Sequence, residues 1–185
     1  LSSARDHGIA TFPEERGASY EENALVKAGY VALATGLPSL GDDSGLEVDA
    51  LEGAPGIYSA RFGGALTSGE RIAHLLSRLR GVPKDARGAT FVCSLVVATP
   101  SGQLQTFRGE CRGQILEGPR GESGFGYDPI FYSPELRKTF AEASEEEKRR
   151  VSHRGRALQA FVDWAHSDNA KKTMREREAP KEANL

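Results

Sequence analysis

The stretch from Ala89 to Thr99 reads ATFVCSLVVAT and is the most strand-like part of the chain. Its alternate residues are apolar on both sides: Phe91, Cys93, Leu95 and Val97 on one, and Val92, Val96 and Ala98 on the other. A strand that is apolar on both faces is typically covered on both faces, so this one is expected at the centre of a sheet. Residues 100–102 form the expected turn, and 103–116 the second arm of a hairpin.

Other elements are predicted around this hairpin. Helical spacing of apolar residues, each time after a capping-box pair, predicts helices at Tyr20–Thr35 and Gly69–Arg80. A short strand is expected between them at 45–51, and further helices at Ser144–Glu147 and 154–166. Helices mixed with a long antiparallel hairpin indicate an α/β or α+β layered domain.

The composition indicates one water-soluble domain. With 24 Lys and Arg against 26 Asp and Glu in 185 residues, the formal net charge is −2, which argues against a dedicated nucleic-acid binder. The longest aliphatic run, 95–98, is too short to span a membrane, and nothing resembles a secretory signal, so a cytoplasmic protein is expected. The domain is expected over 1–167, followed by a charged tail, 168–185, that is expected to be disordered.

Residues 41–45, Gly-Asp-Asp-Ser-Gly, place two carboxylates side by side before the expected strand. Hard cations such as Mg²⁺ take oxygen ligands, so Asp42 and Asp43 are candidate metal ligands. Neighbours in an extended chain point to opposite sides, so only one of the two faces a site directly. The alternative is an acidic turn closed by Ser44 and Gly45.

Asn23 and Lys27 lie four residues apart on the first predicted helix and therefore share a face. A lysine in this position can reach phosphate oxygens as a point charge. The alternative is a solvated lysine that pairs with Asn23 or with an acid.

Segment 118–129, GPRGESGFGYDP, surrounds two aromatic residues with glycines. Phe125 on such a loop offers a flat surface on which a base can stack, and Asp128 can accept a hydrogen bond from a base or sugar. The alternative is a wide turn that buries both Phe125 and Tyr127 in the core.

Segment 148–155, KRRVSHRG, is predicted to open the last helix, with Ser152 as its N-cap. Basic residues at a helix N-terminus oppose the helix dipole, so this placement indicates a bound anion or a base-reading role. The alternative is a basic surface patch balanced by Glu145–Glu147.

Taken together, these segments resemble the inosine triphosphate pyrophosphatase family, whose members hydrolyse non-canonical purine nucleoside triphosphates. The matching stretches are Glu22–Ala28, Asp42–Leu51, Gly53–Arg61, Gly124–Phe131 and Ser152–Gly155. Their order and spacing match over about residues 12–165.

The resemblance implies an elongated, two-lobed α/β domain with a long mixed β-sheet flanked by helices and an active-site cleft between the lobes. It also implies cleavage of ITP, dITP or XTP to the monophosphate and pyrophosphate with Mg²⁺, and usually a homodimer. Neither a nucleic acid nor a membrane is expected as a partner.

Carried onto this sequence, the resemblance gives each candidate residue a role. Asp43 is implied as the proton acceptor that activates the attacking water, and Glu15 and Asp43 as metal-linked carboxylates supported by Asp42. Lys27 and Ser44 are implied to meet the phosphates. The residues implied to hold the sugar and base are Phe125, Gly126, Tyr127, Asp128, Lys148, His153 and Arg154.

Base selection follows from donors and acceptors. Hypoxanthine and xanthine carry a 6-oxo acceptor where adenine carries an amino donor, so donors from Arg154, His153 or loop N–H groups would be mismatched against adenine. Rejection of guanine requires a group that senses its 2-amino substituent, and the sequence assigns no residue to that task.

The family begins with a strand and a Thr-x-Asn-x-x-Lys loop that cradles the triphosphate, and no stretch of this sequence matches them. The domain is therefore expected to be incomplete at its N-terminus. The alternative function is a catalytically weak nucleotide-binding fragment that keeps base recognition without this loop. A third interpretation is a sister pyrophosphatase that acts on modified pyrimidines.

Overall fold

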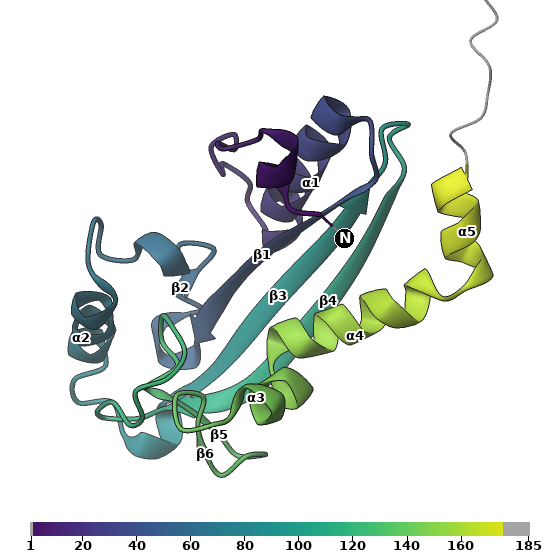
Figure 1. Cartoon of the computed structure of the whole chain (residues 1–185). Coiled ribbons are helices and arrows are strands. Elements are labelled where there is room, and N and C mark those ends of the chain that lie inside the picture. The colour runs from purple at the N-terminus through teal and green to yellow at the C-terminus, as the bar shows by residue number, and fades with distance from the viewer. Residues whose placement is uncertain (1, 176–185) are drawn as a thin grey trace, which may run out of the picture.

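A computed structural model describes residues 2–175 and shows an α/β fold (Figure 1). One sheet contains six strands in the order β2-β1-β3-β4-β5-β6. The strands are β1 (Ser39–Val48), β2 (Pro55–Gly56), β3 (Gly88–Ala98), β4 (Leu104–Ile115), β5 (Phe131–Ser133) and β6 (Lys138–Thr139). The α-helices are α1 (Tyr20–Thr35), α2 (Ser68–Arg78), α3 (Glu145–Val151), α4 (His153–Ala165) and α5 (Asp168–Arg175).

The predicted hairpin forms the centre of the sheet. β3 lies between β1 and β4, and every residue from Phe91 to Ala98 is buried, as expected for a strand that is apolar on both faces. Gly102 closes the turn to β4 with a positive φ of 88°, which glycine adopts without strain.

Neighbouring strands of this sheet all run antiparallel within the described residues. Val48 at the end of β1 pairs with Ala89 near the start of β3, so the connection through α2 returns the chain to the same end of the sheet. The fold class is confirmed, but the sheet is antiparallel where the resemblance implied a mixed one.

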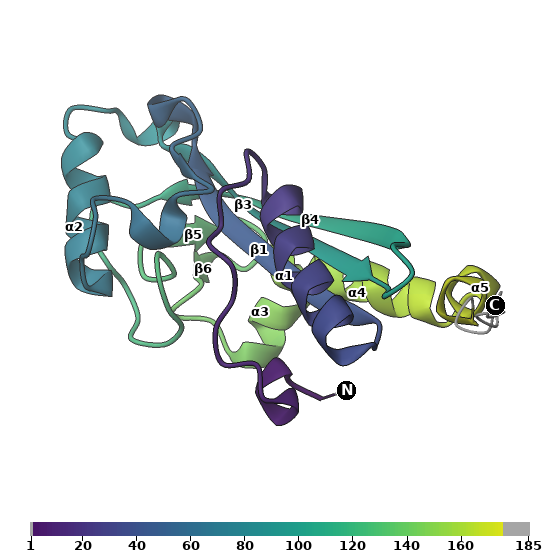
Figure 2. The same ribbon diagram turned by 90° about the horizontal axis from the view of Figure 1, so that it is seen from above.

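α1 and α4 cover opposite faces of the long strands (Figures 1 and 2). A Cβ on Gly41 of β1 would clash with the Ala24 carbonyl oxygen of α1. A Cβ on Gly109 of β4 would clash with the His153 carbonyl oxygen of α4. Because these two positions are glycine, α1 lies directly on the backbone of β1 and α4 directly on the backbone of β4.

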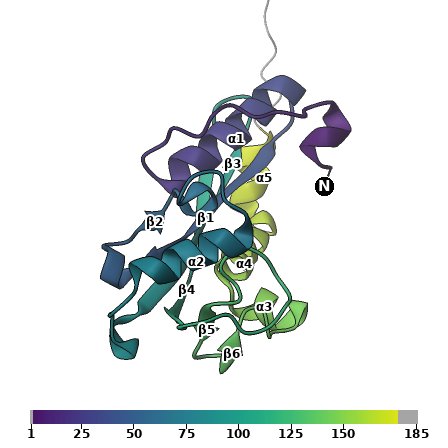
Figure 3. The same cartoon turned by 90° about the vertical axis from the view of Figure 1, so that its left-hand side faces the viewer.

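The largest hydrophobic cluster lies at the end of the sheet where β1 ends and β3 begins, and α2, α3 and β5 pack there (Figure 3). The rings of Phe91, Phe131 and Phe140 contact one another there, with centroids 4.5 to 5.8 Å apart. Burial of each such side chain stabilises the fold by about 1.5–3 kcal/mol. Two smaller clusters lie under α4 and α1, so the core consists of three clusters along the sheet.

β1 begins at Ser39, six residues before the predicted strand, and ends at Val48, where a 3₁₀ turn takes over (Asp49–Leu51). Pairing with β3 along its whole length holds the segment 39–45 extended, although its composition is turn-like. The two adjacent aspartates therefore lie inside a strand, and the acidic-turn alternative is wrong.

The basic residues 148–150 occupy the last turn of α3 and not the start of α4. Cations are favourable at a helix C-terminus, so residues 148–150 do not oppose the helix dipole, and of the basic residues at 148–154 only His153 and Arg154 lie in the first turn of α4. Ser152 is the N-cap of α4, as predicted, and its Oγ accepts a hydrogen bond from the Gly155 N–H at 3.1 Å.

The chain continues into α5, where the sequence analysis expected a disordered tail. Ser167 Oγ accepts a hydrogen bond from the Ala170 N–H at 3.3 Å, and Ala170 is buried, which accounts for this short helix. The rest of the expected tail, 176–185, lies outside the described residues. None of the described helices has the length and apolar character needed to cross a membrane.

Candidate active site

A cleft of about 380 Å³ lies beside the edge of β1, which pairs with β2 only at Leu46 and Glu47. Its walls come from α1, β1, α2, the start of α4 and the loops at 59–60 and 125–128. Every predicted site residue except Lys148 lines it: Glu15, Lys27, Asp42, Asp43, Ser44, Phe125, Gly126, Tyr127, Asp128, His153 and Arg154. The fold thus brings segments from both ends of the sequence to one cleft.

Asp43 is the most enclosed of the carboxylates at one end of this cleft, with 9% of its surface exposed. Asn23 Nδ2 donates to its Oδ2 at 3.1 Å, and Lys27 Nζ lies 3.4 Å from its Oδ1. Both donors belong to the same face of α1, as the four-residue spacing predicted. A charged and a neutral donor together fix the orientation of the carboxylate.

Asn23 has a second task. Its side chain is fully buried, and its Oδ1 accepts a hydrogen bond from the Gly17 N–H at 2.9 Å. One amide therefore connects Asp43 to the segment that carries Glu15. The spacing from Lys27 predicts the face on which Asn23 lies, but the sequence indicates no role for it at the site.

Lys27 lies between two carboxylates. Its Nζ is 3.1 Å from Glu15 Oε1 as well as 3.4 Å from Asp43, and Arg61 Nη1 is 3.8 Å from Glu15 Oε2. In residues 2–175, no group of three or more His, Cys, Asp or Glu side chains is placed to hold a metal ion. Mg²⁺ is commonly bound through one or two carboxylates together with water and substrate phosphates, and Glu15 and Asp43 fit that pattern.

Asp42 is directed away from this pair. Its Oδ2 accepts hydrogen bonds from Arg154 Nε at 3.0 Å and Nη2 at 2.9 Å. The cause is the alternation of β1, which sends neighbouring side chains to opposite faces. Asp42 therefore pairs with Arg154 of α4, whereas the resemblance implied that Asp42 supports the metal-linked carboxylates Glu15 and Asp43.

Phe125 forms the other end of the cleft, and 64% of its surface is exposed. Lys148 Nζ lies 4.8 Å and Arg154 Cζ 5.4 Å from the centre of its ring. Asp128, which is almost fully buried, accepts a hydrogen bond from the Phe125 N–H at 2.7 Å and pairs with Lys148. Asp128 and Lys148 therefore fix the loop under the ring, and Lys148 reaches the site without lining the cleft.

The two aromatic residues of this loop have opposite environments. Tyr127 is buried and its hydroxyl donates to the Ser59 carbonyl oxygen at 3.1 Å, while the Phe125 ring faces solvent. Burial raises the pKa of Tyr127 to about 12, and the positive charge of Arg71 partly offsets the rise. The core interpretation is thus correct for Tyr127 and wrong for Phe125.

His153 opens α4 and is 5% exposed. Its ring stacks on Phe91 at a centroid distance of 4.7 Å, and its Nδ1 has no hydrogen-bond partner among the described residues. Burial, with the nearby charges of Arg154 and Lys148, lowers its pKa to about 3. The imidazole is therefore neutral at physiological pH and offers one donor and one acceptor nitrogen.

Four residues that were not predicted as site residues also line the cleft: Ser59, Ser68, Arg71 and Phe91. Phe91 lies in the predicted strand, where the apolar pattern indicates only a core residue. Arg71 lies in the first turn of α2 and belongs to no recognisable motif. Its position at the cleft depends on how α2 packs, which local pattern does not show.

Residues 1–164 match the model of the Ham1 family. The chain belongs to the Ham1 family. A curated relative called dITP/XTP pyrophosphatase, from Thermus thermophilus, is 58% identical over 151 residues, covering 82% of this chain and 73% of the relative. A protein of the same name from Deinococcus deserti is 56% identical over 161 residues, covering 87% of this chain and 76% of the relative.

Solved structures of Ham1 proteins share the fold. A HAM1 protein from Coxiella burnetii superposes with a TM-score of 0.82 at 39% identity, over 87% of this chain and 83% of that one. A nucleoside-triphosphatase, or dITP/XTP pyrophosphatase, from Mycobacterium abscessus gives a TM-score of 0.70 at 45% identity, over 83% and 81%.

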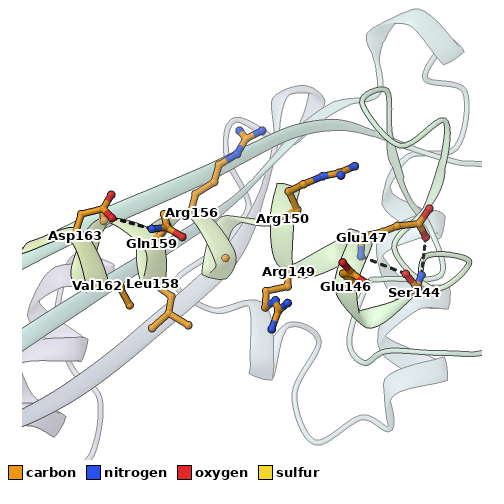
Figure 4. Close-up of a pocket in the computed structure, with 12 residues that line it drawn as sticks. Ser144, Glu146, Glu147, Arg149, Arg150, Arg156, Leu158, Gln159, Val162 and Asp163 are labelled. Carbon is orange, nitrogen blue, oxygen red and sulfur yellow. Dashed lines mark hydrogen bonds between the residues drawn. The ribbon is translucent and has the colours of Figure 1, made fainter. Parts of the chain in front are cut away.

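This Ham1 chain also has a larger hollow, of about 1100 Å³, beside α3 and α4 (Figure 4). Arginines of both helices and glutamates of α3 line it, and Arg149 and Arg150 point in different directions there. None of the predicted site residues lines this hollow. The convergence of carboxylates, cations and an exposed ring, and not the volume, makes the smaller cleft the candidate active site.

Proposed function

We propose that this chain is a nucleoside triphosphate pyrophosphohydrolase that cleaves ITP, dITP and XTP to the monophosphate and pyrophosphate with Mg²⁺. One observation carries the proposal: a single cleft holds the Asp43 carboxylate, oriented by two donors, and the exposed Phe125 ring flanked by cations. The names of relatives at 56–58% identity support the same substrate class.

Asp43 is the proposed general base. It takes a proton from a water molecule as the water oxygen bonds to phosphorus, and the bond between the α- and β-phosphates breaks to release pyrophosphate. A base must be held where the water approaches, and the hydrogen bonds from Asn23 and Lys27 do this.

Glu15 and Asp43 would hold the metal ion, since both already lie within 3.4 Å of the same ammonium nitrogen. Bound Mg²⁺ supplies neutralisation of charge on the phosphate oxygens. Lys27 and Ser44 both line this cleft and would contact those oxygens.

Phe125 would stack on the purine, and Arg154 and His153 would face its 6-oxo group. Arg154 lies over the Phe125 ring, and His153 lines the same cleft. An adenine amino group would leave such donors unpaired, and an unpaired buried donor costs about 1–3 kcal/mol. This mismatch accounts for selection of oxo-purines over adenine.

The test is release of pyrophosphate from ITP, XTP, GTP and ATP with Mg²⁺, and again after removal of the metal with a chelator. We expect release from ITP and XTP, at most slow release from GTP and ATP, loss on chelation and recovery when Mg²⁺ is added back. Equal rates for ITP and ATP would contradict the proposal, as would faster cleavage of modified pyrimidine triphosphates. A folded chain that binds ITP without releasing pyrophosphate would instead be the nucleotide-binding fragment.

Two further expectations stay predictions. The resemblance implies a homodimer, which sedimentation equilibrium of the chain would test. A cytoplasmic location is consistent with a substrate from the nucleotide pool, and cell fractionation would test it.

A further inference from the structure

α1 carries its larger apolar side chains on the side that faces away from the sheet. On the side that packs against β1 and β3, its buried apolar residues in the middle of the helix are Ala24, Ala28 and Ala32. Val26, Tyr30 and Leu33 follow one another at spacings of four and three residues, and they expose 36%, 41% and 76% of their surface. A helix that is apolar on all sides is typically covered on all sides.

Two neighbouring side chains extend this exposed surface. The ring of Phe12 meets that of Tyr30 edge-on, with centroids 6.4 Å apart, and Leu37 follows directly after the Gly36 cap of the helix. The α1 outer face therefore consists of Phe12, Val26, Tyr30, Leu33 and Leu37. It lies at the outside of the molecule, on the face of the sheet opposite α4 (Figures 1 and 2).

Gly29 lies in the middle of α1, next to Val26 and Leu33 on the helix surface. Glycine is less favourable than alanine inside a helix, and a Cβ at this position would have no heavy atom within 4 Å. Nothing in residues 2–175 therefore requires a glycine here. Beside large exposed side chains, a glycine leaves the space in which a second helix can approach closely.

The charges around the α1 outer face argue against a lipid surface as its partner. Residues 28–40 contain no charged residue, and Lys27 is directed to the cleft, where it pairs with Glu15 and Asp43. A helix that binds a membrane surface carries Lys or Arg along its apolar side, and α1 has none besides Lys27.

The same charges suit a second copy of this chain. The acids of α1, Glu21 and Glu22, lie in its first turn, and its last turn has no charge. When two α1 helices run antiparallel across a two-fold axis, the acids of the two copies lie at opposite ends of the contact. Like charges then do not meet, and each helix N-terminus lies beside the C-terminus of the other, which is the favourable dipole arrangement.

The area of the α1 outer face is that of a reversible contact. Its five side chains expose roughly 400 Å² per copy, because a large apolar side chain has about 150–250 Å² of surface. With the polar residues around them, two copies reach about 1,200 Å² of buried surface, the low end of specific interfaces. We therefore expect a dimer that dissociates in the micromolar range.

We propose that the α1 outer face is the contact between two copies of this chain, with the α1 helices antiparallel and Gly29 at their closest approach. This inference rests on the homodimer expected under the proposed function, and on no step of the hydrolysis. α1 also carries Asn23 and Lys27, so the contact supports the helix that orients Asp43.

The test measures the dimer dissociation constant by sedimentation equilibrium for four proteins: the unaltered chain, Leu33→Glu, Gly29→Leu and Leu158→Glu. Leu158 is 43% exposed on α4, on the opposite face of the sheet, so Leu158→Glu controls for a new charge at an exposed leucine. Circular dichroism and urea unfolding, at concentrations where the chain is monomeric, check that each variant is folded.

We expect Leu33→Glu to raise the dissociation constant by about tenfold or more, because it places an unpaired carboxylate in an apolar contact. Gly29→Leu should raise it by about tenfold as well, because the new side chain blocks the close approach of the helices. The same substitution should make the monomer more resistant to urea, since leucine favours a helix more than glycine does. Damage to the fold cannot cause that combination, and Leu158→Glu should change neither quantity.

An unaltered chain that stays monomeric up to millimolar concentration would contradict this inference and the expected homodimer together. A dimer whose dissociation constant is unchanged by both Leu33→Glu and Gly29→Leu would refute the α1 contact alone. Equal weakening by Leu158→Glu would refute it too. Pyrophosphate release from ITP is measured separately, so the failure of this inference is distinguishable from failure of the proposed hydrolysis.

Discussion

Arg154 of α4 donates from Nε and Nη2 to one carboxylate oxygen of Asp42 on β1, at 3.0 and 2.9 Å. The same guanidinium lies 5.4 Å from the centre of the Phe125 ring. Asp42 therefore positions the arginine that is proposed to read the purine 6-position. Neighbouring aspartates of one strand thus have different partners: Asp43 contacts Asn23 and Lys27 of α1, and Asp42 contacts Arg154 of α4.

This pairing makes Asp42→Asn a test of selectivity. We expect the ratio of kcat/KM for ITP to that for ATP to fall about tenfold, because Arg154 loses the contact that orients it. Both side chains are 45% exposed, so the free energy of unfolding should change by less than about 1 kcal/mol. Steady-state kinetics with both nucleotides and urea unfolding measure the two quantities.

Asp49→Asn is the matched control, because Asp49 pairs with Arg112 at similar exposure and lies outside the cleft. It should leave the ITP to ATP ratio unchanged. Arg154→Ala should reduce the ratio more than it slows ITP cleavage. A parallel fall of both rates would show that Arg154 binds phosphate or supports the fold.

Asn23→Ala should damage stability and turnover together. Asn23 is fully buried and joins the Gly17 N–H to Asp43, so its removal leaves that partly buried donor and the Asp43 carboxylate each without one partner and costs about 1–3 kcal/mol of unfolding free energy. We expect kcat to fall more than ITP affinity, since Asp43 loses a positioning contact. Asn169→Ala, on the exposed surface of α5, should change neither quantity. Unchanged kcat in a destabilised Asn23→Ala variant would contradict the positioning role.

The lowered pKa of His153 predicts how the free energy of unfolding depends on pH. Its pKa is about 3 in the folded chain and 6.5 as the ordinary value, so below pH 6.5 the unfolded chain binds a proton that the folded chain does not. Stability from this group is therefore complete above pH 6.5 and is lost as the pH falls, by about 2 kcal/mol between pH 8 and pH 5.

His153→Gln should remove that part of the pH dependence. Urea unfolding of both proteins from pH 8 to pH 5 measures it, above the range where Glu147 contributes, since hydrogen bonds from the Ser144 N–H and from Lys138 lower the pKa of Glu147 to about 2. Identical slopes for the two proteins would show that His153 is not held neutral by burial.

The sequence predicts elements whose signals are local. α1 has the predicted bounds, Tyr20–Thr35, because its cap at Ser19 and its stop at Gly36 are both local. The β3–β4 hairpin follows from a strand that is apolar on both faces, joined to β4 by a short turn. The start of β1 was missed because pairing with β3, a distant segment, decides it.

The candidate site shows the same difference between local signals and contacts of distant segments. Residues selected from separate motifs line one cleft, but the partners of those residues depend on packing. The pair of Asp42 with Arg154 joins positions 112 residues apart, and nothing near Asp42 in the sequence indicates it. Tyr127 is buried and Phe125 exposed because only Tyr127 meets Ser59. Arg71 has no motif, and only the packing of α2 brings it to the cleft.

The most direct test of the account compares Asp43→Asn with the unaltered chain in pyrophosphate release from ITP with Mg²⁺, alongside ITP binding and urea unfolding. Asp85→Asn, on an exposed turn outside the cleft, is the control. We predict that Asp43→Asn loses about 10²–10⁴-fold in turnover, the usual contribution of a general base, while it remains folded and still binds ITP. Near-normal release of pyrophosphate by a folded Asp43→Asn chain would contradict the central claim.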